Sequence, residues 1–245
     1  MNTLKQLPRF KTEAEERKFW ETHNSTDYID WSKAKRTRLP KLKPSARGNV
    51  ILDETKMSEA MEWVSNQTSL IEDDYYNAYS DLLDFFKKLD LQDEQNIVGA
   101  AHAVYGWMPT ILKKETKAAE LVAFTKDLRK IESGPNQRKS ALDQLRQHLH
   151  ITKAINGSTV GTSKFLHFVE PEIFPIWDSN IALAFEVSSK INDPDTYLAY
   201  CEAVHRYLDR NPELNWPNEL PDGISDIRKM EFCLYAYGKS RKPRR

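Results

Sequence analysis

Apolar residues recur at spacings of three and four along most of this chain, and this periodicity constrains the fold more than any other feature. In the segment 72–89, the residues that follow this spacing are Tyr79, Leu82, Leu83, Phe86 and Leu89. Such spacing places side chains on one face of a helix. Only 8 of the 245 residues are glycine, which argues against a loop-rich β-sandwich. We therefore predict an all-α protein.

Capping and breaking residues mark where the predicted helices begin and end. Thr12 with acidic residues three and four positions later is a capping box, and Asp193-Pro194 is an N-cap followed by proline at the first helical position. Besides 72–89, helices are expected near residues 12–23, 56–68, 97–105, 116–131, 137–150, 194–208 and 224–237. Pro40 and Pro44 predict an extended linker over residues 39–50.

Charge is distributed unevenly, although the formal net charge is zero. Residues 33–47 contain seven basic and no acidic side chains, and residues 239–245 contain five basic and no acidic ones. These stretches are either solvated linkers and tails, or they bind nucleic acid or an acidic partner. We predict an arm with a basic linker over 1–47, an α-helical domain over 48–238 and a basic tail over 239–245.

Several classes of protein are disfavoured by what the sequence lacks. Cys201 and Cys233, the two cysteines, lie in helical patterns without metal-ligand spacing. No apolar run reaches the roughly 20 residues that span a bilayer, and Lys5 and Arg9 interrupt the N-terminus where a signal peptide would need an apolar core. Phosphate-binding glycine loops and zinc-protease motifs are missing as well. We expect a cytoplasmic protein without a cofactor, a metal or a membrane contact.

The arm carries more large apolar side chains than it can bury. Phe19, Trp20, Tyr28, Ile29 and Trp31 lie within a segment of two short helical pieces. Such pieces are marginally stable in water without a surface to pack on. The arm must therefore dock either on the helical domain of the same chain or on another protein, where aromatic anchors carry most of the binding energy.

Three elements of the arm are specific enough to suggest a family. They are Phe-Trp-Glu-Thr-His at 19–23, Ser-Thr-Asp-Tyr at 25–28 and Asp-Trp-Ser-Lys-Ala at 30–34, followed by Leu-Pro-Lys-Leu-Lys-Pro-Ser at 39–45. Over residues 8–45 the chain resembles BrnA and related CopG-type antitoxins. The resemblance implies an arm that binds a small ribonuclease toxin. In that family a ribbon-helix-helix that dimerises and binds operator DNA comes next, whereas here a helical body of nearly 200 residues follows.

The leading hypothesis is a non-enzymatic antitoxin-like protein. Its arm binds a small protein toxin, and its body supplies homodimerisation or contact with DNA. The predicted partner-binding residues are the anchors Phe19, Trp20, Tyr28 and Trp31 and the charged rim Lys33, Lys35, Arg36 and Arg38.

A second hypothesis comes from residues 157–182 of the body, where a glycine turn, an apolar helix and a proline-punctuated loop lead to Asp178. This order resembles the helix-hairpin-helix DNA glycosylases, with Gly157 to Gly161 as the hairpin and Asp178 as the catalytic aspartate. The glycines are wider apart than in that family, and the stretch before the aspartate is shorter. The resemblance implies a DNA-binding or glycosylase-like protein, with Asp178 and Lys164 in a cleft lined by basic groups.

Each of these residues also has a plain structural interpretation. Asp178 is placed to cap a helix, Lys164 to lie on an exposed helix face, and His167 and Trp177 to lie in the core. Should Lys164, His167 and Asp178 converge instead, general acid–base catalysis or a lysine nucleophile becomes available.

Overall fold

The computed structural model describes residues 5–10, 12–29, 50–67, 78–108, 110–218, 220 and 223–242. The chain divides into two compact units, residues 1–48 and residues 49–245. We call the first unit the arm and the second the body, and each is described by itself.

In the arm, a short helix and a 3-10 turn follow an extended N-terminal piece. Helix α1 (Glu13–Trp20) begins where the sequence predicts, because the Thr12 hydroxyl accepts a hydrogen bond from the Glu15 amide at 3.3 Å. It ends three residues earlier than predicted. The side chains of Thr22 and His23 bind the Phe19 carbonyl at 3.2 and 2.9 Å, and such local bonds compete with the next helical turn. The turn η1 (Ser25–Asp27) then closes back on Lys5, whose amide donates to the Asp27 carbonyl at 2.8 Å.

The body consists of helices. Their bounds are α2 (Thr55–Ser65), α3 (Tyr79–Lys88), α4 (Glu94–Trp107), α5 (Ala118–Leu128), α6 (Gln137–Gln147), α7 (Thr159–Val169), α8 (Ser179–Ala184), α9 (Pro194–Arg210) and α10 (Asp226–Ser240). Short 3-10 turns follow α6 and α8. The described residues contain no strand, only an isolated bridge between Thr116 and Ile155. The predicted all-α fold is confirmed.

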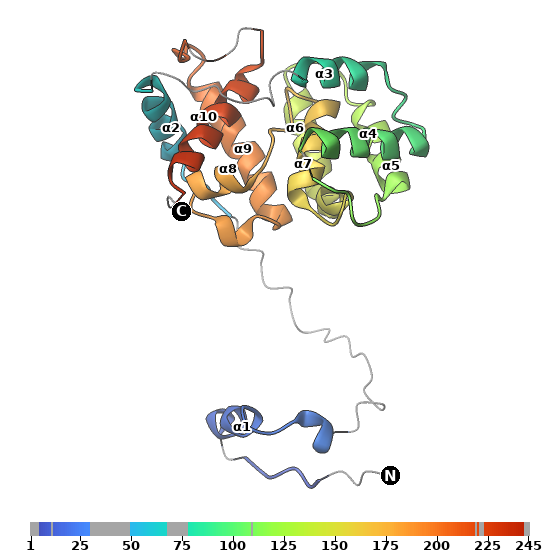
Figure 1. Ribbon diagram of the computed structural model, residues 1–245, viewed down its shortest axis with the longest axis vertical. Coiled ribbons are helices and arrows are strands. Elements are labelled where there is room, and N and C mark those ends of the chain that lie inside the picture. Colours follow the sequence, from blue (N-terminus) through green and yellow to red (C-terminus); the bar gives the residue numbers. More distant parts are fainter. Residues whose placement is uncertain are drawn as a thin grey trace. The chain divides into compact units, whose positions relative to one another are not determined.

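The helices of the body form two groups that share one core (Figure 1). In one group α10 packs on α2, α8 and α9, and in the other α4 packs on α3, α5 and α7. Helix α6 contacts α9 and so joins the groups. The largest fully buried side chains include Trp177, Tyr197, Tyr200, Phe165 and Phe174. None of the described helices is both long and apolar enough to cross a membrane.

Helix bounds differ from the predicted ones where a cap was overlooked. Helix α4 begins at Glu94 rather than near 97, because the Asp93 carboxylate accepts a hydrogen bond from the Gln95 amide at 2.7 Å. It also continues through Gly106 to Trp107. The predicted linker lies outside the described residues except for Val50, and so does the part of the predicted helix 72–89 before Ala78.

Candidate functional site

Two places in the chain combine the side chains that the sequence singled out, and the first is an aromatic cluster in the arm. Phe19 is its centre: its ring centroid lies 5.0 Å from that of Trp20, 5.3 Å from that of Tyr28 and 5.2 Å from that of Phe10. The imidazole of His23 stacks on Phe19 with the ring centroids 4.0 Å apart. Helix α1 and the turn η1 thus bring three of the predicted anchors together.

The arm does not bury this cluster. Phe10, Phe19, Trp20 and Tyr28 are all half-buried, Ile29 is exposed, and none of the described arm residues is fully buried. The polar contacts of the arm are surface contacts, such as the Lys5–Asp27 ion pair at 2.9 Å, and exposed pairs of this kind contribute little stability. The cluster therefore leaves part of each aromatic ring accessible on the surface of the arm.

Five predicted partner-binding residues, namely Trp31, Lys33, Lys35, Arg36 and Arg38, lie outside the described residues. Phe10 and His23 join the cluster without having been predicted as anchors. His23 stands four positions after Phe19, a spacing that brings side chains together on a helix, so its position could have indicated the contact.

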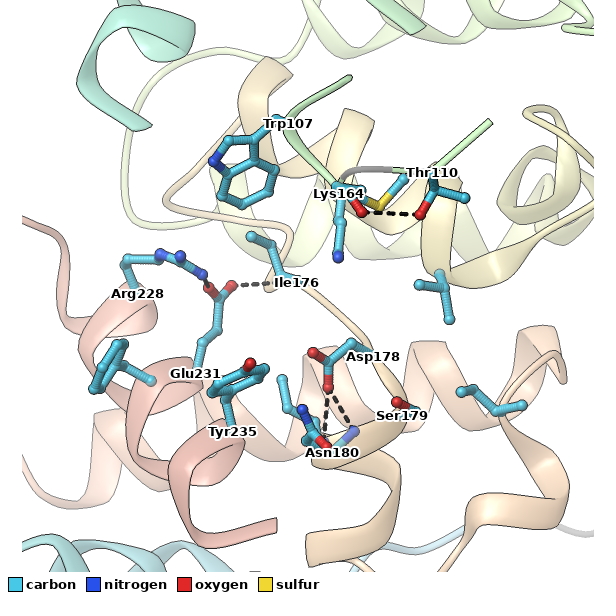
Figure 2. A pocket seen from close by; sticks show the side chains of 15 residues that line it. Trp107, Thr110, Lys164, Ile176, Asp178, Ser179, Asn180, Arg228, Glu231 and Tyr235 are labelled. Carbon is cyan, nitrogen blue, oxygen red and sulfur yellow. Dashed lines mark hydrogen bonds and ion pairs between the residues drawn. The ribbon is translucent and has the colours of Figure 1, made fainter. Parts of the chain in front are cut away.

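The second place is a pocket of about 350 Å³ in the body, between the two groups of helices. Its walls come from the end of α4, from α7, from the start of α8 and from α10 (Figure 2). The polar groups lining it include Lys164, Asp178, Asn180, Arg228 and Glu231, and the apolar ones include Trp107, Ile176, Ile181, Phe232 and Tyr235. The pocket thus brings Lys164 and Asp178 together.

Lys164 is half-buried on α7 and points its amine into the pocket, toward the side where Asp178 lies (Figure 2). The amine also lies 5.7 Å from the centroid of the Trp107 ring. Burial lowers the pKa of Lys164, and the nearby Arg228 lowers it further, whereas the carboxylates of Asp178 and Glu231 oppose the shift. More of the amine is therefore neutral near pH 7 than in an exposed lysine, and the neutral amine is the form that acts as a nucleophile or base.

Asp178 is the N-cap of α8, as one of the two interpretations of the sequence holds. Its Oδ1 atom accepts hydrogen bonds from the amides of Asn180 and Ile181 at 2.8 and 2.9 Å. Both bonds end on the same oxygen, so Oδ2 takes no part in the cap. Capping and a role in the pocket are therefore compatible for this residue.

A buried ion pair that the sequence analysis missed forms one wall of the pocket. Glu231 is 1% exposed and accepts a hydrogen bond from Arg228 at 2.7 Å, and the Arg228 guanidinium lies 4.8 Å from the centroid of the Tyr79 ring. A signal existed, because Glu231 stands four residues after Ile227 and three before Leu234, on the apolar face of the last helix. A charge on such a face is either paired or functional.

His167 lies in the core, as its apolar neighbours predicted. It is fully buried; its Nδ1 atom donates to the Phe174 carbonyl at 2.9 Å, and its Nε2 atom accepts from the Tyr79 hydroxyl at 2.7 Å. Burial lowers the pKa of His167, which keeps the ring neutral at pH 7. His167 therefore supports the pocket from behind and does not line it.

The predicted glycine hairpin is only partly correct. Asn156 and Gly157 turn the chain with φ of 57° and 63°, a region that favours glycine. Gly161, by contrast, lies within α7, where a Cβ atom would come 2.7 Å from Cζ of Tyr105. It permits close packing of α7 on α4 and forms no part of the turn.

The predicted cleft is also only partly basic. Lys164 and Arg228 are matched there by the carboxylates of Asp178 and Glu231. Among the described residues there is no cluster of three or more His, Cys, Asp or Glu side chains that could hold a metal ion.

One comparison with known proteins gives a match. Residues 5–68 match the family model of the CopG antitoxin of type II toxin-antitoxin systems, which confirms the resemblance predicted for the arm. The match covers about a quarter of the chain and ends just after α2, the first helix of the body. Neither the curated proteins nor the solved structures yield a relative that matches this chain.

Proposed function

We propose that this protein is an antitoxin that binds a small protein toxin through the aromatic cluster of its arm. The observation that carries the proposal is the coincidence of two findings on the same residues. The CopG antitoxin match covers the arm, and the arm holds Phe19, Trp20 and Tyr28 in a half-exposed cluster. Clustered, half-exposed aromatic rings are the side chains that most often dominate protein interfaces.

The basic stretch after the cluster suggests the charge of the partner. Lys33, Lys35, Arg36 and Arg38 follow Trp31 in a segment without acidic residues. In this proposal Trp31 is a further anchor, and the four basic residues form a rim that faces acidic groups on the toxin. Rim charges of this kind mainly raise the association rate and make it sensitive to salt.

The test uses the full chain as bait in lysate of the cells that produce it. Wild-type protein should recover a small protein whose ribonuclease activity it inhibits, and Phe19→Ala with Trp20→Ala should weaken that complex by 30-fold or more, as the loss of about 2 kcal/mol at an interface anchor implies. Phe85→Ala is the matched control, since Phe85 is an aromatic residue of the body that is 40% exposed. Equal recovery by wild type and the arm variant would contradict the proposal.

A second candidate function concerns the body: an activity on DNA of the helix-hairpin-helix type. The observation that favours it is that Lys164 and Asp178, fourteen residues apart, line one pocket. In this role the neutral amine of Lys164 attacks the sugar carbon that carries a DNA base, the glycosidic bond breaks, and the base leaves with the bonding electrons. The Asp178 carboxylate takes the proton that the amine gives up.

Asp178→Asn separates this role from the structural one, because asparagine caps helices as well as aspartate does. The variant should fold normally and lose 100-fold or more of any DNA strand-cleaving activity, the usual scale for removing an acid–base group. Full activity in Asp178→Asn would remove Asp178 from the reaction.

A further inference from the structure

After α7 the chain turns at residues 171–173 and then runs through 174–177 to Asp178 without secondary structure; residues 173–177 are buried. Irregular backbone in a protein interior must find hydrogen-bond partners, because an unpaired buried amide or carbonyl costs about 1–3 kcal/mol. Neighbouring strands usually supply these partners. Here the Glu170 carbonyl accepts from the amides of Ile173 and Phe174, and buried side chains from three helices supply the partners described below.

Helix α7 binds the 173–177 segment through one residue before Lys164 and one residue after it. Ser163, the residue before Lys164, accepts a hydrogen bond from the Trp177 amide at 3.0 Å, and its hydroxyl lies 3.2 Å from the Trp177 carbonyl. His167, three residues after Lys164, binds the Phe174 carbonyl. The backbone next to Asp178 is therefore fastened to the backbone next to Lys164.

Helices α9 and α10 hold the same segment from the other side. The Tyr197 hydroxyl donates to the Pro175 carbonyl at 3.2 Å, and the Glu231 carboxylate accepts from the Ile176 amide. On α9 the His205 ring also lies 2.7 Å from the Ile173 carbonyl. Each of these side chains is at least nine-tenths buried.

We infer that Ser163 and Tyr197 are positioning residues of the pocket, which fix the 173–177 segment so that the Asp178 carboxylate faces the Lys164 amine. Neither residue lines the pocket, so each acts through the backbone that carries Asp178. The purpose of this positioning rests on the second candidate function, since Lys164 as a nucleophile would need the Asp178 carboxylate at a fixed place. The positioning itself can be measured without any DNA substrate.

Lys164 reports on the position of Asp178 through its proton affinity. The charged groups that act on its amine are Asp178 from the start of α8, and Arg228 and Glu231 from α10. Because the Asp178 carboxylate favours the ammonium form, moving it away makes the amine lose its proton at a lower pH.

The experiment measures acetylation of Lys164 by acetic anhydride as a function of pH, on the full chain, with peptide mass spectrometry. Asp178→Asn serves as the reference and should move the midpoint to lower pH. Ser163→Ala and Tyr197→Phe should move it in the same direction, by less than Asp178→Asn does but by more than the error of the titration. Neither should move it further once Asp178→Asn is present, because residues that act through one group are not additive. Ser163→Thr, which keeps the hydroxyl, should restore the wild-type midpoint.

Thr125→Val is the matched control, since it removes a buried hydroxyl that bonds the Leu91 and Val122 carbonyls and neither the 173–177 segment nor a residue lining the pocket. It should leave the midpoint unchanged. Should Ser163→Ala fail to fold, Tyr197→Phe carries the test alone, because it removes one oxygen and keeps the ring. An unchanged midpoint in folded Tyr197→Phe or Ser163→Ala would overturn the inference, and so would an equal shift with and without Asp178. Absence of DNA cleavage would contradict only the second candidate function.

Discussion

Replacing Gly238 by alanine tests the packing of α10 on α8. A Cβ atom at Gly238 would lie 2.6 Å from the carbonyl carbon of Asn180 and 3.2 Å from the amide nitrogen of Ala184. Both atoms belong to the backbone of α8, so no rotamer change removes the clash. Non-bonded carbon atoms prefer about 3.5–4.0 Å, so the two helices must separate by about 1 Å.

The expected loss follows from two opposing terms. Overpacking of a well-packed interior costs about 1–3 kcal/mol and occasionally more, and a clash with backbone belongs at the upper end. Alanine in a helix interior gains about 1 kcal/mol over glycine. The net expectation for Gly238→Ala is a loss of about 2 kcal/mol of unfolding free energy, or about 4–8 °C in Tm for a body of this size.

Gly99→Ala is the matched control in the same kind of element. Gly99 is exposed in the middle of α4, and its added Cβ would meet no atom within 4 Å. This variant should gain about 0.5–1 kcal/mol from helix propensity. Urea unfolding followed by circular dichroism measures both variants. Equal stability of Gly238→Ala and Gly99→Ala would refute the packing argument.

Three further predictions concern the body. Burial lowers the pKa of His205 to about 4. As the pH falls, the imidazole of the unfolded chain takes up a proton near pH 6.5, whereas the buried imidazole of the folded chain stays neutral down to about pH 4. His205 should therefore lower the unfolding free energy by about 3 kcal/mol between pH 7 and pH 4. His205→Gln should flatten the pH dependence of urea unfolding over that range, and an unchanged slope would argue against a buried neutral imidazole. Asp193 caps α9 by accepting a hydrogen bond from the Thr196 amide at 3.0 Å; Asp193→Ala should therefore cost about 1 kcal/mol in the same assay and Asp193→Ser much less. Burial raises the pKa of Cys233 to about 12 and raises that of Cys201 as well, so iodoacetamide at pH 8 should modify both thiols only in denaturant, and rapid labelling of the native protein would contradict their burial.

Local features of the sequence predicted most of the helices correctly. Thr12, Asp178 and Asp193 cap helices where the sequence indicated, because capping depends on residues one to three positions away. Tyr197, Tyr200 and Val204 lie in the core, because their spacing of three and four places them on one face of α9. Helix ends such as that of α1 were less predictable. The side chains of Thr22 and His23 bond the Phe19 carbonyl, and the helix ends before the residues that its sequence pattern would still include.

The pocket was predictable only in part. Asp178 was expected at a helix start, and Lys164 on a helix face, but whether that face is exposed depends on how α4 and α10 dock. The residues that bond the 173–177 segment are distant from it in the sequence: Tyr197 is 22 residues from Pro175, and Glu231 is 55 residues from Ile176. No local pattern encodes pairs of that separation.

The bond from Glu231 to the backbone of Ile176 has a consequence for biosynthesis. When residues up to about 210 of the nascent chain have left the ribosome, Lys164, Asp178 and Tyr197 are outside the exit tunnel. Helix α10 is not, so the Ile176 amide still lacks its acceptor Glu231. Burying it at that stage would leave a donor without a bond. Completion of the pocket therefore waits for α10 to leave the exit tunnel, and a nascent chain that has not yet released this helix cannot present the finished site.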